Sequence, residues 1–124
     1  MQLNILIVDD EPEIRFMTRR LLSAEGATVT EAEHGKAALE HLADGLPVDL
    51  VITDIVMPEK EGLETIMELR RKYPDVRILA MSGGGKGSST AYLELASKMG
   101  ADAIVKKPFR KAELMAAIQT ATEG

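Results

Sequence analysis

The stretch NILIV, residues 4–8, is a short apolar run, and the overlapping stretch LIVDDEPE, residues 6–13, carries it straight into four acidic residues. Runs rich in Ile, Leu and Val without clean alternation are typical of strands that are covered on both faces. Two further runs share this character, LVIT at 50–53 and RILAM at 77–81. We therefore expect three central strands in a sheet with helices on both faces.

Two other runs have the composition of edge strands. TVTEA at 28–32 alternates polar with apolar residues, and DAIVK at 102–106 is flanked by charge. Both features protect the open edge of a sheet from pairing with another chain. We therefore place the second and fifth strands at the two edges.

Segments with apolar residues at helical spacing separate the strands. The apolar positions are Ile14, Met17 and Leu21 in the first segment, Leu63, Ile66 and Met67 in the third, and Tyr92, Leu95, Ala96 and Met99 in the fourth. Gly26, Gly45 and Gly100 follow the first, second and fourth segments, where a glycine can cap a helix in the left-handed conformation. Five alternating βα units predict one α/β domain, residues 1–124, with a doubly wound parallel sheet.

Composition narrows the function classes. The chain has 124 residues, about one domain, with 15 basic and 20 acidic residues and a formal net charge of -5. This balance disfavours nonspecific attraction to nucleic acid or an anionic membrane. Cysteine is absent, which excludes disulfide and thiolate chemistry, and the first residues do not resemble a signal peptide. We expect a cytoplasmic protein that binds neither nucleic acid nor membrane directly.

Polar residues follow four of the predicted strands. Asp9 and Asp10 follow the first strand, Asp54 the third and Ser82 the fourth, and Lys107 stands at the end of the fifth. The carboxyl ends of parallel strands share one edge of the sheet, where ligands bind in such folds, so these side chains should converge. Taken singly, each has an ordinary explanation as a helix cap, a loop serine or an edge lysine.

Together these residues indicate phosphoryl chemistry. Clustered carboxylates repel one another and raise one another's pKa unless a cation lies among them. Mg²⁺ suits such a site because it prefers oxygen ligands and often completes its shell with phosphate oxygens. Lys107 and Ser82 could then contact phosphoryl oxygens, while one carboxylate acts as the nucleophile that forms an aspartyl phosphate. Spacing alone does not decide which carboxylate this is.

The same residues carry a family resemblance. VDD at 8–10, DIVMPEKEG at 54–62, Ser82 and KPF at 107–109 resemble the signature of the response regulator receiver domain, and the likeness extends over the whole chain. The resemblance implies strand order 2-1-3-4-5, which agrees with the two edge strands inferred above. It also implies a cis peptide bond between Lys107 and Pro108.

The resemblance further implies a role for each site residue. Asp54 would be the phosphoacceptor, and Asp9, Asp10 and Asp54 would hold Mg²⁺ together with the backbone carbonyl of Val56. Ser82 and Lys107 would contact the phosphoryl group.

The function implied is a phosphorylation-activated switch of a two-component or phosphorelay system. The phosphoryl donor would be a sensor histidine kinase or a phosphotransfer protein. A downstream protein target or effector domain would dock on the fourth helix, fifth strand and fifth helix. The only catalysis expected is the domain's own phosphotransfer and dephosphorylation.

Two other function classes use a similar sheet. A Mg²⁺-dependent phosphohydrolase acting through an aspartyl phosphate is the alternative, but the chain has no cap segment to form a substrate pocket. A flavin-binding module fits poorly, because the loop after the first strand is acidic and aromatics make up only 3% of residues.

Several residues fall outside the pattern. Ile104 stands where the family often has Tyr or Phe, so the resemblance does not extend to an aromatic switch there. Residues 82–89, SGGGKGSS, lack the Ser or Thr that a phosphate-binding loop needs after its lysine, and we expect a flexible loop that closes over the phosphoryl group.

Glu11 and Glu13 are assigned to the first turn of a helix, where acidic side chains interact favourably with the positive end of the helix dipole. His34 and His41 are assigned no role.

Overall fold

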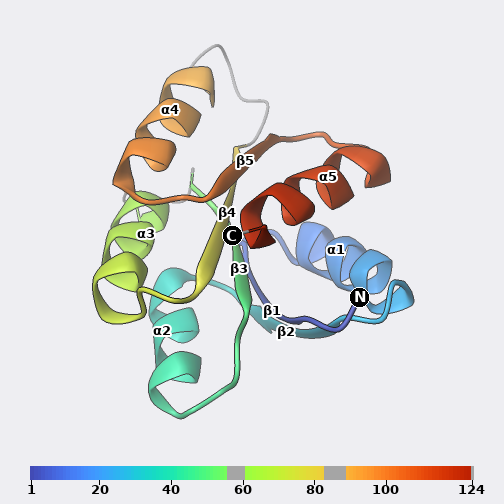
Figure 1. Ribbon diagram of the computed structural model, residues 1–124, viewed down its shortest axis with the longest axis horizontal. Helices are drawn as coiled ribbons and strands as arrows, with labels where there is room; N and C mark the ends of the chain where they lie inside the picture. Colours follow the sequence, from blue (N-terminus) through green and yellow to red (C-terminus); the bar gives the residue numbers. More distant parts are fainter. Residues whose placement is uncertain (56–60, 83–88, 124) are drawn as a thin grey trace.

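Strands and helices alternate along the chain in a computed structural model that describes residues 1–55, 61–82 and 89–123 (Figure 1). The strands are β1 (Asn4–Val8), β2 (Thr28–Ala32), β3 (Leu50–Asp54), β4 (Arg77–Ser82) and β5 (Ala103–Lys106). The helices are α1 (Pro12–Ala24), α2 (Gly35–Ala43), α3 (Glu61–Lys72), α4 (Ser89–Met99) and α5 (Lys111–Thr122). All neighbouring strands are parallel, in the order β2-β1-β3-β4-β5, which confirms the predicted fold class and both edge strands.

The sheet separates two hydrophobic layers. Helices α1 and α5 cover one face, and α2, α3 and α4 cover the other (Figure 1). Successive residues of β1 contribute to opposite layers, since Leu6 and Val8 pack with α2–α4 while Ile5 and Ile7 pack with α1 and α5. Because both faces are buried, β1 needs apolar residues at every position, which is why NILIV does not alternate.

The helical segments are confirmed, but their buried faces differ in part from the predicted ones. In α1 the buried residues are Thr18 and Leu22, whereas Met17 is 46% exposed. In α3 Ile66 is buried but Met67 is 52% exposed. A helix aligns its buried stripe with the sheet below it, and a stripe can include a polar residue such as Thr18 that hydrophobic spacing passes over.

The predicted caps are present. Gly26, Gly45 and Gly100 have φ values of 95°, 92° and 123°, in the left-handed region that favours glycine. A different cap begins α2, where the Nδ1 atom of His34 accepts a hydrogen bond from the Ala37 N–H at 3.0 Å. His34 therefore has a structural role that the sequence did not reveal.

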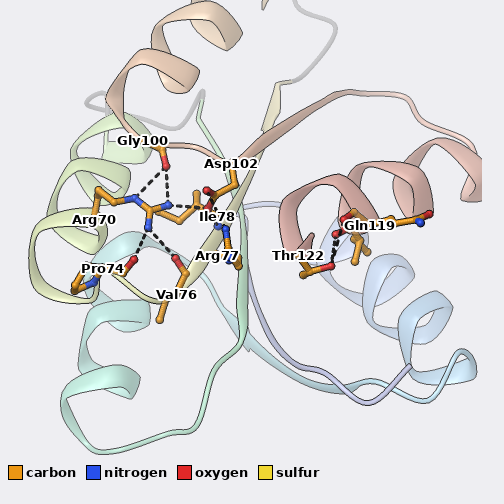
Figure 2. Close-up of polar contacts among 10 residues, drawn as sticks. Arg70, Pro74, Val76, Arg77, Ile78, Gly100, Asp102, Gln119 and Thr122 are labelled. Carbon is orange, nitrogen blue, oxygen red and sulfur yellow. Dashed lines mark hydrogen bonds and ion pairs between the residues drawn. The ribbon is translucent and has the colours of Figure 1, made fainter. Parts of the chain in front are cut away.

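The amino ends of β4 and β5 are joined to α3 and α4 by Arg70 (Figure 2). Its guanidinium donates to the carbonyls of Gly100, Pro74 and Val76 at 2.7–3.1 Å and to Asp102 Oδ2 at 2.7 Å. The same carboxylate oxygen accepts the Ile78 N–H at 2.8 Å. This network holds the end of the sheet opposite the carboxyl ends of the strands. Within the described ranges, no helix is long and apolar enough to cross a membrane.

Candidate functional site

Four of the predicted site residues are buried together at the carboxyl ends of the strands. Asp9 lies one residue beyond β1, Asp54 and Ser82 end β3 and β4, and Lys107 follows β5. Asp10, next to Asp9, is exposed. Since the strands are parallel and aligned, residues from distant parts of the sequence meet at one edge, as expected.

Lys107 joins the two buried carboxylates. Its Nζ atom lies 2.6 Å from Asp9 Oδ2 and 3.1 Å from Asp54 Oδ2. Burial alone would lower the pKa of Lys107. The hydrogen bond to Asp9 and the negative charges of Asp54 and Asp9 outweigh burial, so the pKa is raised above its ordinary value. Lys107 is therefore held as a cation between two anions.

The backbone around Lys107 supports this placement. The Lys107 N–H donates to the Ser82 carbonyl at 2.8 Å, which continues the β4–β5 pairing by one residue. The Lys107–Pro108 peptide bond is cis, as the resemblance implied.

Four carboxylates gather beside Lys107. Asp9, Asp10, Glu11 and Asp54 each offer an oxygen atom, and these atoms lie within 4.8 Å of one another. Mg²⁺ prefers oxygen ligands, and a close group of carboxylate oxygens supplies them, so the residues fit that ion. Both Asp9 oxygens already accept hydrogen bonds, Oδ2 from Lys107 and Oδ1 from the Glu11 N–H at 2.9 Å.

Glu11 differs from its prediction. It is the N-cap residue of α1, preceding the first turn, and its side chain makes no capping hydrogen bond. Instead its Oε1 atom lies 3.7 Å from Lys107 Nζ, so it belongs to the acidic cluster. The three consecutive acids at residues 9–11 could have indicated that Glu11 belongs to the cluster. Its position next to the start of α1 indicated instead an interaction with the helix dipole.

Gly62 fixes how α3 begins beside Asp54. A Cβ atom at Gly62 would lie 2.5 Å from the Asp54 carbonyl oxygen and 2.5 Å from Ile55 Cα. No side chain fits there, so glycine is required for the start of α3 to pack directly on the end of β3. This contact gives a physical reason for the glycine that closes DIVMPEKEG.

Some predicted features lie outside the described residues. These are the Val56 carbonyl, expected as a metal ligand, and residues 83–88 of the glycine-rich segment, expected to close over a phosphoryl group.

Arg15 contacts the site and was not predicted. Its guanidinium donates to the Asp9 carbonyl at 2.7 Å and pairs with Glu31 of β2 at 3.2 Å. Apolar spacing carries no information about a charged residue that folds back on the loop preceding its own helix, so no sequence signal marked it.

The chain matches a known family along most of its length. The model described as "Response regulator receiver domain" matches residues 5–119.

Curated relatives agree with this match. The transcriptional regulatory protein CpxR of Klebsiella pneumoniae is 38% identical over 115 residues, which cover 93% of this chain and 47% of that protein. The sensor kinase CckA of Brucella abortus is 34% identical over 120 residues, covering 96% of this chain and 12% of that protein. The chain therefore spans about half of the first relative and a small part of the second.

Solved structures share the fold. A response regulator receiver domain protein from Clostridium thermocellum has a TM-score of 0.86 at 29% identity, covering 97% of this chain and 94% of that one. The receiver domain of NtrX from Brucella abortus has a TM-score of 0.87 at 30% identity, covering 97% and 98%.

Proposed function

The chain belongs to the response regulator receiver domain family, whose members are signalling proteins, and on this premise we propose that it is a switch activated by phosphorylation of Asp54. We treat residues 1–124 as one receiver domain. The observation that carries the proposal is the buried pair of Asp54 and Lys107 beside the cluster of carboxylates.

Asp54 is the carboxylate best suited to accept the phosphoryl group. Asp9 lies one residue beyond β1, in the turn before α1, and Asp10 is exposed to solvent. Asp54 ends the central strand β3, is buried, and has Lys107 Nζ 3.1 Å from its Oδ2 atom. A nearby cation stabilises the ionised carboxylate, which is the nucleophilic form.

The metal ligands proposed are Asp9, Asp10, Asp54 and the Val56 carbonyl. When bound there, Mg²⁺ would offset the charge of the phosphoryl oxygens and of the clustered carboxylates. Each Asp9 oxygen accepts one hydrogen bond and has a second lone pair, so Asp9 can still be a metal ligand beside Asp10 and Asp54.

Lys107 and Ser82 would recognise the transferred group. Lys107 Nζ already lies between Asp9 and Asp54, so a phosphoryl oxygen on Asp54 could replace one of its carboxylate partners. Ser82 is buried at the end of the neighbouring strand β4, where its hydroxyl could donate to a second phosphoryl oxygen. The same groups would support the domain's own transfer and loss of phosphate, its only proposed catalysis.

Partners follow from this role. The phosphoryl donor would be a sensor histidine kinase or a phosphotransfer protein, and the output would be a protein target or an effector domain. The docking surface proposed is formed by α4, β5 and α5 (Figure 1). Its apolar side chains include Leu95 of α4 and Ile104 of β5, with exposed fractions of 39% and 42%. Partly exposed apolar residues on adjacent elements suit a protein partner.

Acetyl phosphate provides a direct test. The wild-type chain with Mg²⁺ should gain one phosphoryl group by intact-mass measurement, whereas Asp54→Asn should gain none because an amide is not a nucleophile here. Asp10→Ala should be labelled more slowly at the same Mg²⁺ concentration. Full labelling of Asp54→Asn, or full labelling of the wild type in excess chelator, would contradict the proposal.

A further inference from the structure

Arg15 holds the backbone of the residue that begins the acidic cluster. Its Nη1 atom donates to the Asp9 carbonyl oxygen at 2.7 Å. Asp9 lies one residue beyond the last paired residue of β1, and its N–H donates to the Ala32 carbonyl of β2 at 3.2 Å. Both backbone polar groups of Asp9 are therefore bonded, although the strand has already ended.

Arg15 is itself held in place. Its Nε atom lies 3.2 Å from Glu31 Oε1, and its side chain is only 14% exposed. The other oxygen of Glu31 pairs with Arg19 Nε at 3.0 Å, and the Arg19 side chain is 44% exposed. A planar guanidinium that is partly buried and bound at two points has little freedom, so it can impose a geometry on Asp9.

The hydrogen bond from Arg15 affects the turn between β1 and α1, which sets the direction of the carboxylates. Asp9 and Asp10 lie between the end of β1 and the start of α1, and the side chain of Asp9 is fixed at its other end by the Glu11 N–H. Rotation of this turn would move the carboxylates of both residues relative to Asp54, which is fixed in β3. A metal ion needs its ligands at set distances, so small rotations weaken binding.

We propose that Arg15, oriented by Glu31, is a positioning residue for the metal site and increases the affinity of the unphosphorylated domain for Mg²⁺. This inference rests on the proposed function, because it assigns Arg15 a part in the same site. Arg15 touches neither the metal nor the phosphoryl group. It acts through the Asp9 backbone.

An electrostatic role and a positioning role of Arg15 predict opposite changes in Mg²⁺ affinity when Arg15 is removed. If the guanidinium acted only as a positive charge, its removal would reduce repulsion of Mg²⁺ and tighten binding. If it positions Asp9 and Asp10, its removal weakens binding in spite of the lost charge. The sign of the change in affinity therefore distinguishes positioning from simple electrostatics.

Arg19 provides a matched control. Arg15→Gln and Arg19→Gln each remove one positive charge and one ion pair with Glu31, but only the first removes the hydrogen bond to Asp9. Arg15→Lys retains the charge and loses the planar fork that reaches Asp9 and Glu31 together. Mg²⁺ affinity is measured on the whole chain by calorimetric titration, after circular dichroism has shown that each variant is folded.

We expect Arg15→Gln to weaken Mg²⁺ binding about tenfold, or ~1.4 kcal/mol, and Arg19→Gln to change it less than about twofold. The rate of labelling by acetyl phosphate should then require more Mg²⁺ in Arg15→Gln but recover at saturating Mg²⁺. A general loss of structure would lower the rate at all Mg²⁺ concentrations instead.

Other outcomes would overturn the inference. These are equal or tighter binding by Arg15→Gln, or equal weakening in both glutamine variants. If Arg15→Gln did not fold, unchanged affinity in folded Arg15→Lys would also overturn it. If the wild-type chain bound no Mg²⁺, the proposed metal site and the role of Arg15 would both fail, whereas the preceding results would leave the metal site intact.

Discussion

Single residues at the candidate site show why buried charge is tolerated here. Lys107 is hydrogen-bonded to Asp9 and Asp54, so three buried charged groups compensate one another in part. Removing one member of such a group leaves the others buried without a partner, which is more costly than the pairing is stabilising. The arrangement is therefore better explained by a need for charge at this edge than by stability.

The first prediction concerns the pH dependence of this pairing. The pKa of Lys107 is raised in the folded chain above its value in the unfolded chain. The stability that its charge contributes is therefore fully present below the unfolded pKa, about 10.4, and is lost as pH rises through the raised folded pKa. We expect the difference in free energy of unfolding between the wild type and Lys107→Met to be constant from pH 7 to about 9.5 and to shrink in more alkaline solution.

Urea unfolding of both proteins across this range measures the difference, and titrating groups that do not contact Lys107 cancel because both chains contain them in the same surroundings. A difference that grew with pH would show that Lys107 is not stabilised as a cation.

A second residue-scale prediction concerns Thr18. Its side chain is buried in α1, and among the described residues its Oγ1 atom has no hydrogen-bond partner. Burial without a partner is costly, so Thr18→Val, which has nearly the same shape, should raise the free energy of unfolding by about 1 kcal/mol. Thr53 is a matched control, since its buried hydroxyl donates to the Asp54 carbonyl at 3.0 Å.

Thr53→Val should therefore lower the free energy of unfolding by about 1 kcal/mol. Chemical denaturation measures both variants. Equal destabilisation by the two substitutions would mean that the Thr18 hydroxyl has a stabilising contact.

Whole elements are joined by polar contacts that no local pattern reveals. His34 caps α2 through a side-chain nitrogen, although Ser, Thr, Asp and Asn are the usual N-caps. Arg70 connects α3 with the ends of α4 and β4 by donating to the carbonyl of Gly100, just after α4, and to that of Val76, just before β4 (Figure 2). An arginine has five N–H donors and can bond several carbonyls at once.

The prediction at this scale is that Arg70→Lys destabilises the fold by about 2 kcal/mol. An ammonium cannot reach Gly100, Val76 and Asp102 together, so part-buried carbonyls would lose their donors. Arg71 is the control, because its side chain is 71% exposed and its ion pair with Glu68 is long, at 3.8 Å. Arg71→Lys should change the free energy of unfolding by less than about 0.5 kcal/mol.

Thermal or urea unfolding distinguishes the two variants. Similar small effects for both would indicate that the Arg70 contacts are replaced by water at little cost.

The whole molecule combines a rigid sheet with an acidic edge. Both faces of β1, β3 and β4 are covered, so the carboxyl ends of these strands are held at fixed spacing beneath the site. Asp54 and Ser82 are strand residues and share this rigidity. Asp10 and Glu11 lie in the connecting turn and depend on contacts such as that of Arg15.

The whole-molecule prediction is that Mg²⁺ stabilises the fold. An ion that binds only the folded chain adds about 2.7 kcal/mol at a hundred times its Kd. Asp10→Ala should lose most of this gain because it removes a proposed ligand. Glu13→Ala should keep it, since Glu13 is an exposed acid of α1 outside the cluster. A thermal midpoint that rose equally with Mg²⁺ in all three proteins would indicate nonspecific screening of the net charge.

The sequence by itself determined the fold class, the edge strands and the convergence of Asp9, Asp54, Ser82 and Lys107, because each depends on alternation and spacing along the chain. β1 and β2 have the predicted bounds, and β3, β4 and β5 differ by a single residue each.

Only the tertiary structure decided the contacts between side chains whose positions depend on several elements at once. Arg15 reaches Asp9 because α1 packs on β2 through Glu31, and Glu11 joins the cluster because Lys107 arrives from β5. Gly62 is required because the backbones of α3 and β3 meet there. Hydrophobic periodicity indicates which segments form strands and helices, whereas the partners of a long polar side chain are settled only when the elements are packed together.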